Sequence, residues 1–357
     1  MKKLLITLLK FGVSIALLVY LVRGAAQDNA FENLRDQPKD WYAFVGAFFL
    51  CFLAVVLSIV RWYFLVRALE MPFRLRDAFR LGFLGYLLNF VSLGNVGGDL
   101  FKAVFIAREQ HSRRAEAVAT VVVDRVIGLY VLFLVATTAI FWTGFWSSGV
   151  REIQIVCRAT LICTVVGGVG LVVLLWPGFT HGVASRRLAE LPRVGPIIER
   201  LLQAVRMYRR KPAVLLLAAG LTVGVHVFTA LGVYLVARGL PGTAPSLGSH
   251  FVVVPLAMVV GALPLPLSGL GAFEGALDFL YVYASSPEEV SAGQGLLVAF
   301  GYRLVTVAIA MVGVGIWLAS RREVAATLHD AEEIEAGHDP DVVPPKETLE
   351  LARREPS

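Results

Sequence analysis

The chain has 357 residues, of which 57% are apolar and 17% charged, and its mean hydropathy is +0.70. A soluble domain carries about 25% charged residues. Several apolar runs here exceed the roughly 18 residues that mark a membrane span. The composition therefore excludes a secreted, a soluble cytosolic or a nucleic-acid-binding protein and indicates an all-α polytopic membrane protein.

The formal net charge of +6 combines two opposite parts. In the tail, 323–357, ten acidic and three basic residues give −7, whereas residues 1–322 carry +13. We therefore expect a transmembrane domain over 1–322 and an acidic, disordered cytoplasmic tail over 323–357. Because the basic part is also apolar, its expected partners are anionic membrane lipids, and no nucleic acid is expected.

Six apolar runs have a length that suits a complete crossing of a bilayer core of about 30 Å. They cover 4–22, 41–60, 116–141, 153–176, 213–237 and 294–318. The first run follows two lysines and could be a signal peptide. Its length and the internal Lys10 favour an uncleaved first helix.

Two further stretches fit a complete crossing less well. The first is 78–92 followed by 96–107, and these legs reach only about 22 and 18 Å at 1.5 Å per residue. The second is 249–266 followed by 270–284, and its prolines at 255, 264 and 266 break a helix. Non-helical backbone at membrane depth needs protein or a water-filled cavity around it, so we predict a re-entrant hairpin in each stretch.

The positions of the basic residues favour this topology. With both hairpins returning to their own side and a cytoplasmic N-terminus, 19 lysines and arginines, Arg61 among them, fall in inside segments and 5 in outside segments. One full crossing per hairpin would give 10 inside and 14 outside. Since inside loops carry the basic excess, we expect a bacterial-type cytoplasmic (inner) membrane protein with both termini in the cytoplasm. The rule does not separate a re-entrant hairpin from two short full spans.

In this order the two hairpins lie between spans of opposite orientation, which is the pattern of an inverted repeat. Many secondary transporters have this architecture, with the substrate site where broken helices meet. Between the fourth and fifth runs, the segment 185–211 mixes eight basic residues with apolar ones. It is either a pair of interfacial helices or a solvated basic loop.

Ionisable residues at membrane depth are costly and face an interior or a cavity. Each predicted hairpin has an acid just after a glycine-rich break, and the following span has an arginine. The pairs are Asp99 with Arg125 and Glu274 with Arg303, separated by 26 and 29 residues. With them, the predicted substrate-binding residues are Asp99, Lys102, Arg125, Glu274, Arg303, Asp124 and Asn95, and the predicted hairpin glycines are Gly94, Gly97, Gly98, Gly269 and Gly271. These glycines permit positive φ and close approach of two backbones.

Two interpretations of the acids stay open. Asp99 and Glu274 fall in the first turn of half-helices, where a carboxylate is stabilised, so they could only cap helices and lock the fold through the arginines. They could in addition contact a substrate. Asp124 and Arg125 point to different helix faces, so at most one is expected in any single cavity. Weaker candidates are Asn89, His226, Asp278 and Tyr302.

The cysteines and tryptophans indicate structure rather than chemistry. Cys51, Cys157 and Cys163 lie inside apolar runs without metal-ligand spacing, so we expect buried, unreactive thiols, no metal and no cofactor. Five tryptophans stand near run ends, as in interfacial belts: Trp41, Trp62, Trp142, Trp146 and Trp176.

Several motifs resemble the transmembrane-region family of the lysylphosphatidylglycerol synthases, which are flippase-like integral membrane proteins. They are GGDLFK at 97–102, RRAEAVAT at 113–120, DRVIGL at 124–129, PLPLSGLGAFEG at 264–275 and Tyr302-Arg303. The resemblance covers about residues 4–320. The family commonly has Gly-Glu and arginine where this chain has Gly98-Asp99 and Lys102, and Glu-Arg where it has Asp124-Arg125, so charge is kept at each place.

The resemblance implies a domain that binds or moves lipids, including aminoacylated phosphatidylglycerol and lipid-linked precursors. Larger members add a cytosolic domain that transfers an amino acid from tRNA to the lipid. Only 37 residues follow Ser320, so that activity is not expected.

Three functions are compatible with these features. The leading hypothesis is a lipid flippase-like transporter that takes a headgroup into a polar cavity between the hairpins. The alternative is a non-transporting scaffold or partner subunit of a biosynthetic enzyme in an envelope-lipid or glycan pathway. An intramembrane enzyme would need clustered acids or a nucleophile with a base, and the sequence has no such motif, so the chain is not expected to be an enzyme.

Overall fold

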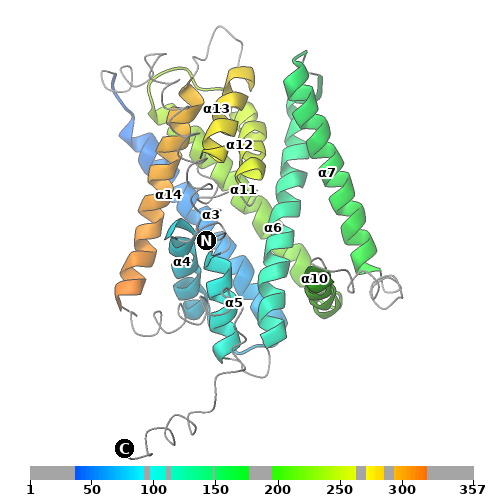
Figure 1. The fold of residues 1–357 in the computed structure, drawn as a ribbon. Coiled ribbons are helices and arrows are strands. Elements are labelled where there is room, and N and C mark those ends of the chain that lie inside the picture. Colours follow the sequence, from blue (N-terminus) through cyan, green and yellow to red (C-terminus); the bar gives the residue numbers. More distant parts are fainter. Residues whose placement is uncertain are drawn as a thin grey trace, which may run out of the picture.

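The computed structural model is all-helical in the part of the chain that it describes, with no strand there (Figure 1). The described residues are 37–91, 97–109, 114–147, 149–176, 195–262, 271–284 and 293–319. The predicted first span 4–22, the tail 323–357, Gly94, Asn95 and Gly269 lie outside them.

Five described helices are long and apolar enough to cross a membrane, which makes this an integral membrane protein. They are α3 (Trp41–Ala68), α6 (Arg114–Thr143), α7 (Arg151–Leu175), α11 (Pro212–Gly239) and α14 (Gln294–Ala319). Each corresponds to one of the apolar runs that the sequence predicted. Their outward side chains are apolar, for example Val165 and Val169 of α7, which are more than half exposed, as a lipid-facing surface requires.

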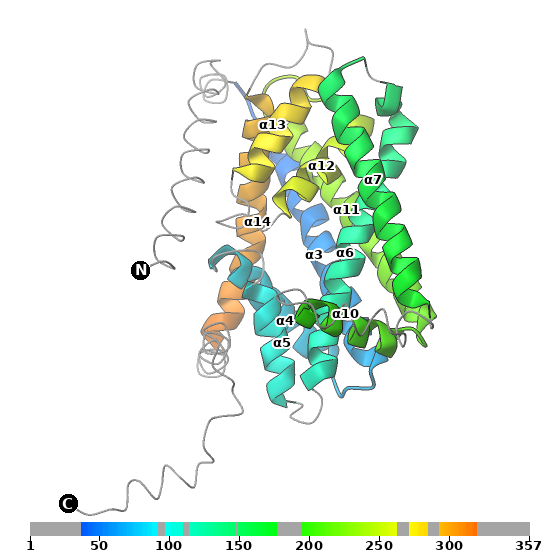
Figure 2. The ribbon, with the colours of Figure 1, turned by 45° about the vertical axis from the view of Figure 1, so that its right-hand side comes forward.

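The two stretches predicted as hairpins each form two shorter helices. They are α4 (Leu75–Val91) with α5 (Gly97–Glu109), and α12 (Leu247–Gly261) with α13 (Ala272–Ala284). The members of each pair pack against one another, and the two pairs occupy opposite ends of the bundle (Figures 1 and 2). Pro255 does not break α12, which continues to Gly261. Whether the pairs re-enter or cross the bilayer stays a prediction.

The packing of α3 to α6 is repeated by α11 to α14. In each set the first helix packs against the second, the second against the third and the third against the fourth. Contacts between the sets also correspond, because the second helix of each set packs against the fourth helix of the other: α4 against α14, and α12 against α6. Such exchange of contacts is what an inverted repeat produces. Helices α7 and α10 (Gly195–Tyr208) have no counterpart among the described residues.

Helices α3 and α11 run antiparallel, side by side, and form the most extensive helix–helix contact among the described residues. The backbone N–H at the start of α3, on Asp40, donates to the carbonyl of Gly239 at the end of α11 over 3.1 Å. Further along, a side chain on Gly224 would begin 3.0 Å from Cδ1 of Leu57, so the glycine keeps the two helices close. Small residues are typical of such seams in membrane proteins.

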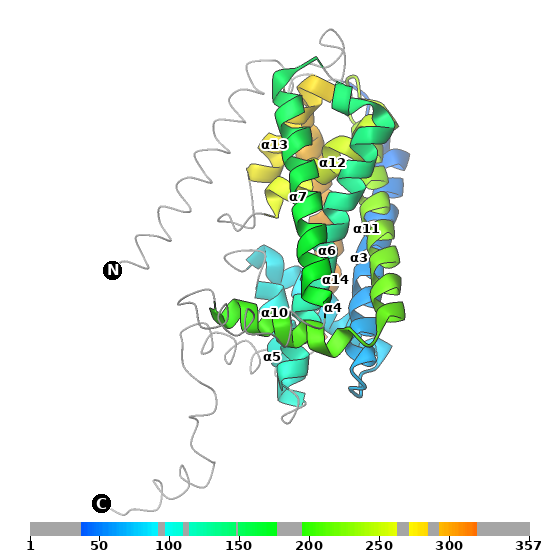
Figure 3. The ribbon, with the colours of Figure 1, turned by 90° about the vertical axis from the view of Figure 1, so that its right-hand side faces the viewer.

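Helix α10 is amphipathic and lies across the long axis of the bundle, packed against α6 and α7 (Figure 3). Its last residue, the buried Tyr208, donates from its hydroxyl to the carbonyl of Leu65 in α3 over 2.7 Å. The interpretation of this part of the segment 185–211 as a solvated loop is therefore wrong. A single amphipathic helix in this orientation is typical of an interfacial helix.

Two expectations about uncharged residues need correction. Cys163 is exposed on α7, because it lies on the side of this helix that faces away from α6, whereas Cys51 and Cys157 are buried. Trp62 is only 1% exposed and so is not part of an interfacial belt. The other four predicted belt tryptophans, Trp41, Trp142, Trp146 and Trp176, are exposed near helix ends.

Candidate functional site

A cavity of about 510 Å³ lies between the two repeats, and all eight repeat helices contribute to its lining. Its ionisable lining residues are Arg61, Asp99, Lys102, Asp124, Arg125, His226, Tyr86, Tyr302, Arg303 and Cys51. The cavity wall therefore combines apolar side chains with a cluster of charged ones, inside a bundle whose outer surface is apolar. Polar groups placed in this way are typical of a substrate pathway.

The first predicted ion pair is present. Asp99 is the third residue of α5, and its Oδ2 accepts a hydrogen bond from Nε of Arg125 in α6. The Asp99 side chain is largely buried, whereas that of Arg125 is 51% exposed. The arginine therefore keeps donors directed at the cavity while its partner holds it in place.

The second predicted ion pair is also present, and it is more enclosed. Glu274 is the third residue of α13, and its Oε1 accepts hydrogen bonds from Nη2 and Nε of Arg303 over 2.5 and 3.2 Å. Its Oε2 accepts from the backbone N–H of Gly271 over 2.8 Å. Glu274 is fully buried and is not part of the cavity lining, so it both caps α13 and positions Arg303 at the cavity wall.

Two of the predicted glycines are required for different reasons. Gly271 has φ of +88°, a conformation that strains any residue with a side chain. Gly98 allows close approach, because a side chain there would overlap the carbonyl of Gly85 and lie 2.7 Å from Oδ1 of Asn89. The backbone N–H of Gly98 donates to that oxygen over 3.1 Å, so Asn89 joins α4 to the start of α5.

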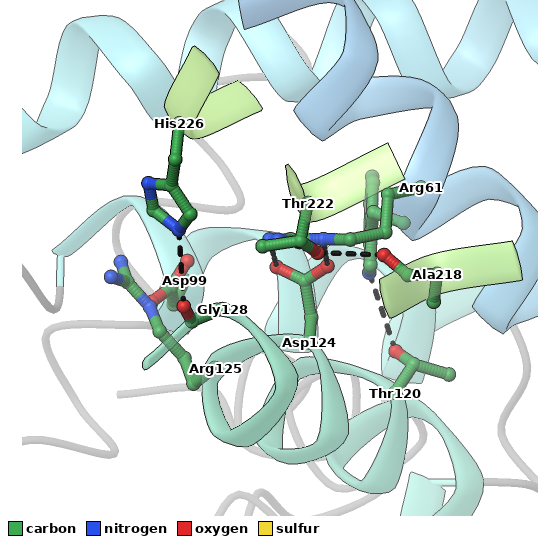
Figure 4. Close-up of polar contacts among 10 residues, drawn as sticks. Arg61, Asp99, Thr120, Asp124, Arg125, Gly128, Ala218, Thr222 and His226 are labelled. Carbon is green, nitrogen blue, oxygen red and sulfur yellow. Dashed lines mark hydrogen bonds and ion pairs between the residues drawn. The ribbon is translucent and has the colours of Figure 1, made fainter. Parts of the chain in front are cut away.

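A third ion pair, missed by the sequence analysis, links Arg61 and Asp124 (Figure 4). Arg61 lies in α3, is only 6% exposed and donates from Nε and Nη2 to the two carboxylate oxygens over 2.7 and 2.8 Å. Its Nη1 donates to Oγ1 of Thr222 in α11 over 2.9 Å. The pair therefore holds α3, α6 and α11 together through one guanidinium.

Two predictions about the charged residues of α3 and α6 need correction, and the first concerns Arg61. It was counted among the cytoplasmic loop residues, but α3 continues past it to Ala68, so it lies inside the helix. A signal was present, because apolar residues from Trp62 to Val66 follow it directly. The second correction is that Asp124 and Arg125 line the same cavity, although they pair with different helices.

Lys102 differs from the other cations. It forms no ion pair or hydrogen bond with the described residues, and its ammonium lies 5.1 Å from the ring centre of the buried Trp62. Arg61, Arg125 and Arg303 are each matched by one carboxylate. Among the described residues, Lys102 therefore leaves this neighbourhood with one excess positive charge.

Some of the weaker candidates line the cavity, and others join helices away from it. Tyr302 and His226 line the cavity, and a ring nitrogen of His226 lies 3.3 Å from the carbonyl oxygen of Gly128. Asp278 is not in the lining and accepts from the backbone N–H of Leu296 over 3.0 Å, which ties α13 to α14.

Comparison with known proteins places the chain in a family of membrane proteins. The lysylphosphatidylglycerol synthase transmembrane region matches residues 7–313. The chain belongs to this family. It is also similar to a UPF0104 membrane protein from Methanothermobacter thermautotrophicus, at 25% identity over 257 residues, which is 68% of this chain and 75% of the relative. The matched range, 7–313, spans the positions of all the residues that line the cavity.

Proposed function

We propose that this family member binds the headgroup of a phospholipid or lipid-linked precursor in the central cavity and moves it across the membrane. The headgroup enters the polar cavity while the acyl chains stay in the bilayer. The proposal includes no catalytic step. Of the described charged side chains that line the cavity, Asp99, Asp124 and the three arginines are held in ion pairs, and Lys102 lies over an aromatic ring.

The excess positive charge of the cavity carries the proposal. Three arginines and Lys102 oppose Asp99, Asp124 and Glu274 inside a bundle of membrane helices. An unneutralised cation at membrane depth is costly unless a cavity or a counter-charge stabilises it. A phosphate supplies that counter-charge, and a lipid brings it into the membrane.

Each cation has a distinct part in the proposed site. The Arg125 side chain is half exposed, and a guanidinium presents paired donors to phosphate oxygens. Arg303 approaches from the other repeat, positioned by the buried Glu274. Lys102 adds the charge that no described carboxylate neutralises. Arg61 is enclosed by Asp124 and Thr222 and holds helices α3, α6 and α11 together.

Replacing Lys102 tests the proposal without breaking an ion pair. Lys102 is the sixth residue of α5, and the sixth residue of α13 is the buried Leu277. The Lys102→Leu variant therefore has leucine at this position in both repeats. The leucine side chain can also pack on Trp62. We expect transport of a fluorescent phosphatidylglycerol analogue in reconstituted vesicles to fall about tenfold, because a charged hydrogen bond is lost.

The matched control is Arg151→Ala, which removes an exposed positive charge at the start of α7, away from the cavity lining. It is expected to transport as the unaltered protein does. Transport is also measured for Arg125→Ala and Arg303→Ala, and the folding of each variant is checked by size-exclusion chromatography. Undiminished transport in all three folded cavity variants would remove the site assignment. Lipid binding without any movement by the unaltered protein would favour the scaffold function instead.

A further inference from the structure

The inference concerns His226, which projects from α11 into the wall of the cavity (Figure 4). The residue is only 7% exposed. Its Nε2 lies 3.3 Å from the carbonyl oxygen of Gly128 in α6. Its other ring nitrogen, Nδ1, is buried and has no hydrogen-bond partner among the described residues. Buried polar atoms are rarely left in this state, and each exception needs an explanation.

The contact with Gly128 determines what Nδ1 can do. A carbonyl oxygen only accepts hydrogen bonds, so Nε2 must carry the proton and donate it. In the neutral imidazole, Nδ1 then has a free lone pair and is an acceptor. A ligand group that pairs with Nδ1 must therefore be a hydrogen-bond donor. The charged lining groups do not supply this function, because the cations donate and the carboxylates of Asp99 and Asp124 already accept from arginine.

The acceptor and the proposed phosphate ligand belong to one cavity, because His226 and Arg125 both line it. Gly128, which Nε2 of His226 contacts, lies three residues after Arg125 on α6, which is about 4.5 Å along the helix axis. A headgroup whose phosphate is held by Arg125 therefore occupies the cavity that His226 also lines.

We propose that Nδ1 of His226 accepts a hydrogen bond from a donor, a hydroxyl or an ammonium group, next to the phosphate of the bound headgroup. His226 then selects headgroups with such a donor over those without one. This inference rests on the proposed function and adds the substrate class: a phosphodiester with a donor on its short head, rather than any anionic lipid. An unpaired acceptor discriminates strongly, because a ligand without the donor leaves it buried and unsatisfied.

The experiment measures lipids bound to the purified protein by native mass spectrometry, after equilibration with vesicles that contain two competing lipids. Phosphatidylethanolamine against phosphatidylcholine tests an ammonium donor at equal net charge. Phosphatidylglycerol against phosphatidylmethanol tests a hydroxyl donor at equal net charge. We expect the unaltered protein to prefer the donor-bearing lipid about tenfold in at least one of these pairs.

Two substitutions of His226 separate the roles of its nitrogens. His226→Gln places an amide N–H near the position of Nε2, so the bond to Gly128 is kept and the Nδ1 acceptor is lost. His226→Asn places its amide oxygen near the position of Nδ1, so the acceptor is kept and the bond to Gly128 is lost. We expect the preference to disappear in His226→Gln and to persist in His226→Asn, with phosphate-dependent binding kept in both.

The outcomes are distinguishable. A preference in the ammonium pair alone, or in the hydroxyl pair alone, supports the inference and names the donor. Equal binding within both pairs overturns it, and so does a preference that survives in His226→Gln, because the cavity would then select by size. Absence of any bound phospholipid in the unaltered protein would instead contradict the proposed function itself.

Discussion

Replacing Arg61 by methionine is expected to lower the free energy of unfolding by about 3–5 kcal/mol. The substitution leaves the buried carboxylate of Asp124 without its bidentate partner and Thr222 without its donor. A buried charge that loses its partner is among the most destabilising changes in a protein. The measurement is denaturant unfolding of the purified protein in detergent.

A second variant identifies the cause. Arg61→Met combined with Asp124→Leu removes both charges, and well-packed apolar replacements of a buried pair are often tolerated. We expect this double variant to recover most of the lost stability, and Arg151→Met, at an exposed position, to have no effect. A double variant less stable than Arg61→Met would show that the pair is not an isolated electrostatic unit.

The second large effect is expected from Gly98→Val. The added side chain would overlap the carbonyl of Gly85, and backbone atoms on both sides leave little room for adjustment. Separation of α4 from α5 would also break the hydrogen bond from Gly98 to Asn89. We expect a loss of about 3 kcal/mol in the free energy of unfolding, at the upper end of overpacking effects.

The matched substitution is Gly170→Val in α7, where a side chain would meet no atom within 4 Å. A change of about 0.5 kcal/mol or less is expected there. Comparable destabilisation at both glycines would mean that valine disfavours these helices in general, and the close approach of α4 and α5 would not be the cause.

The sequence was sufficient for the elements that depend on local pattern. Apolar runs predicted six spans, and the five of them that fall among the described residues are long helices, since length and hydropathy alone define a helix that can cross a bilayer. The pairs Asp99–Arg125 and Glu274–Arg303 were also predictable, because the same arrangement of acid, glycine and arginine occurs twice. Repetition gave these residues a signal that a single charged residue does not have.

Features that depend on packing between distant segments were not predictable. Arg61 pairs with Asp124 across 63 residues, and nothing local to either one indicates the other. Trp62 stands beside a charged residue, as interfacial tryptophans do, yet it is buried because Phe73 and Lys102 pack against its ring. The position of Asp124 and Arg125 in one cavity depends on the width of that cavity, and helix periodicity does not define it.

The two repeats share their contacts but not their charges. Leu277 stands where the first repeat has Lys102, and Tyr302 precedes Arg303 where Asp124 precedes Arg125. In a carrier built from inverted repeats, the outward-facing and inward-facing states arise when the two halves exchange conformations. Here the halves are electrostatically unequal, so the exchange is not energetically neutral. For the transport function proposed above, this inequality predicts that the empty protein favours a state whose binding site opens to one leaflet, and that the charge of the bound headgroup sets the balance between the two states.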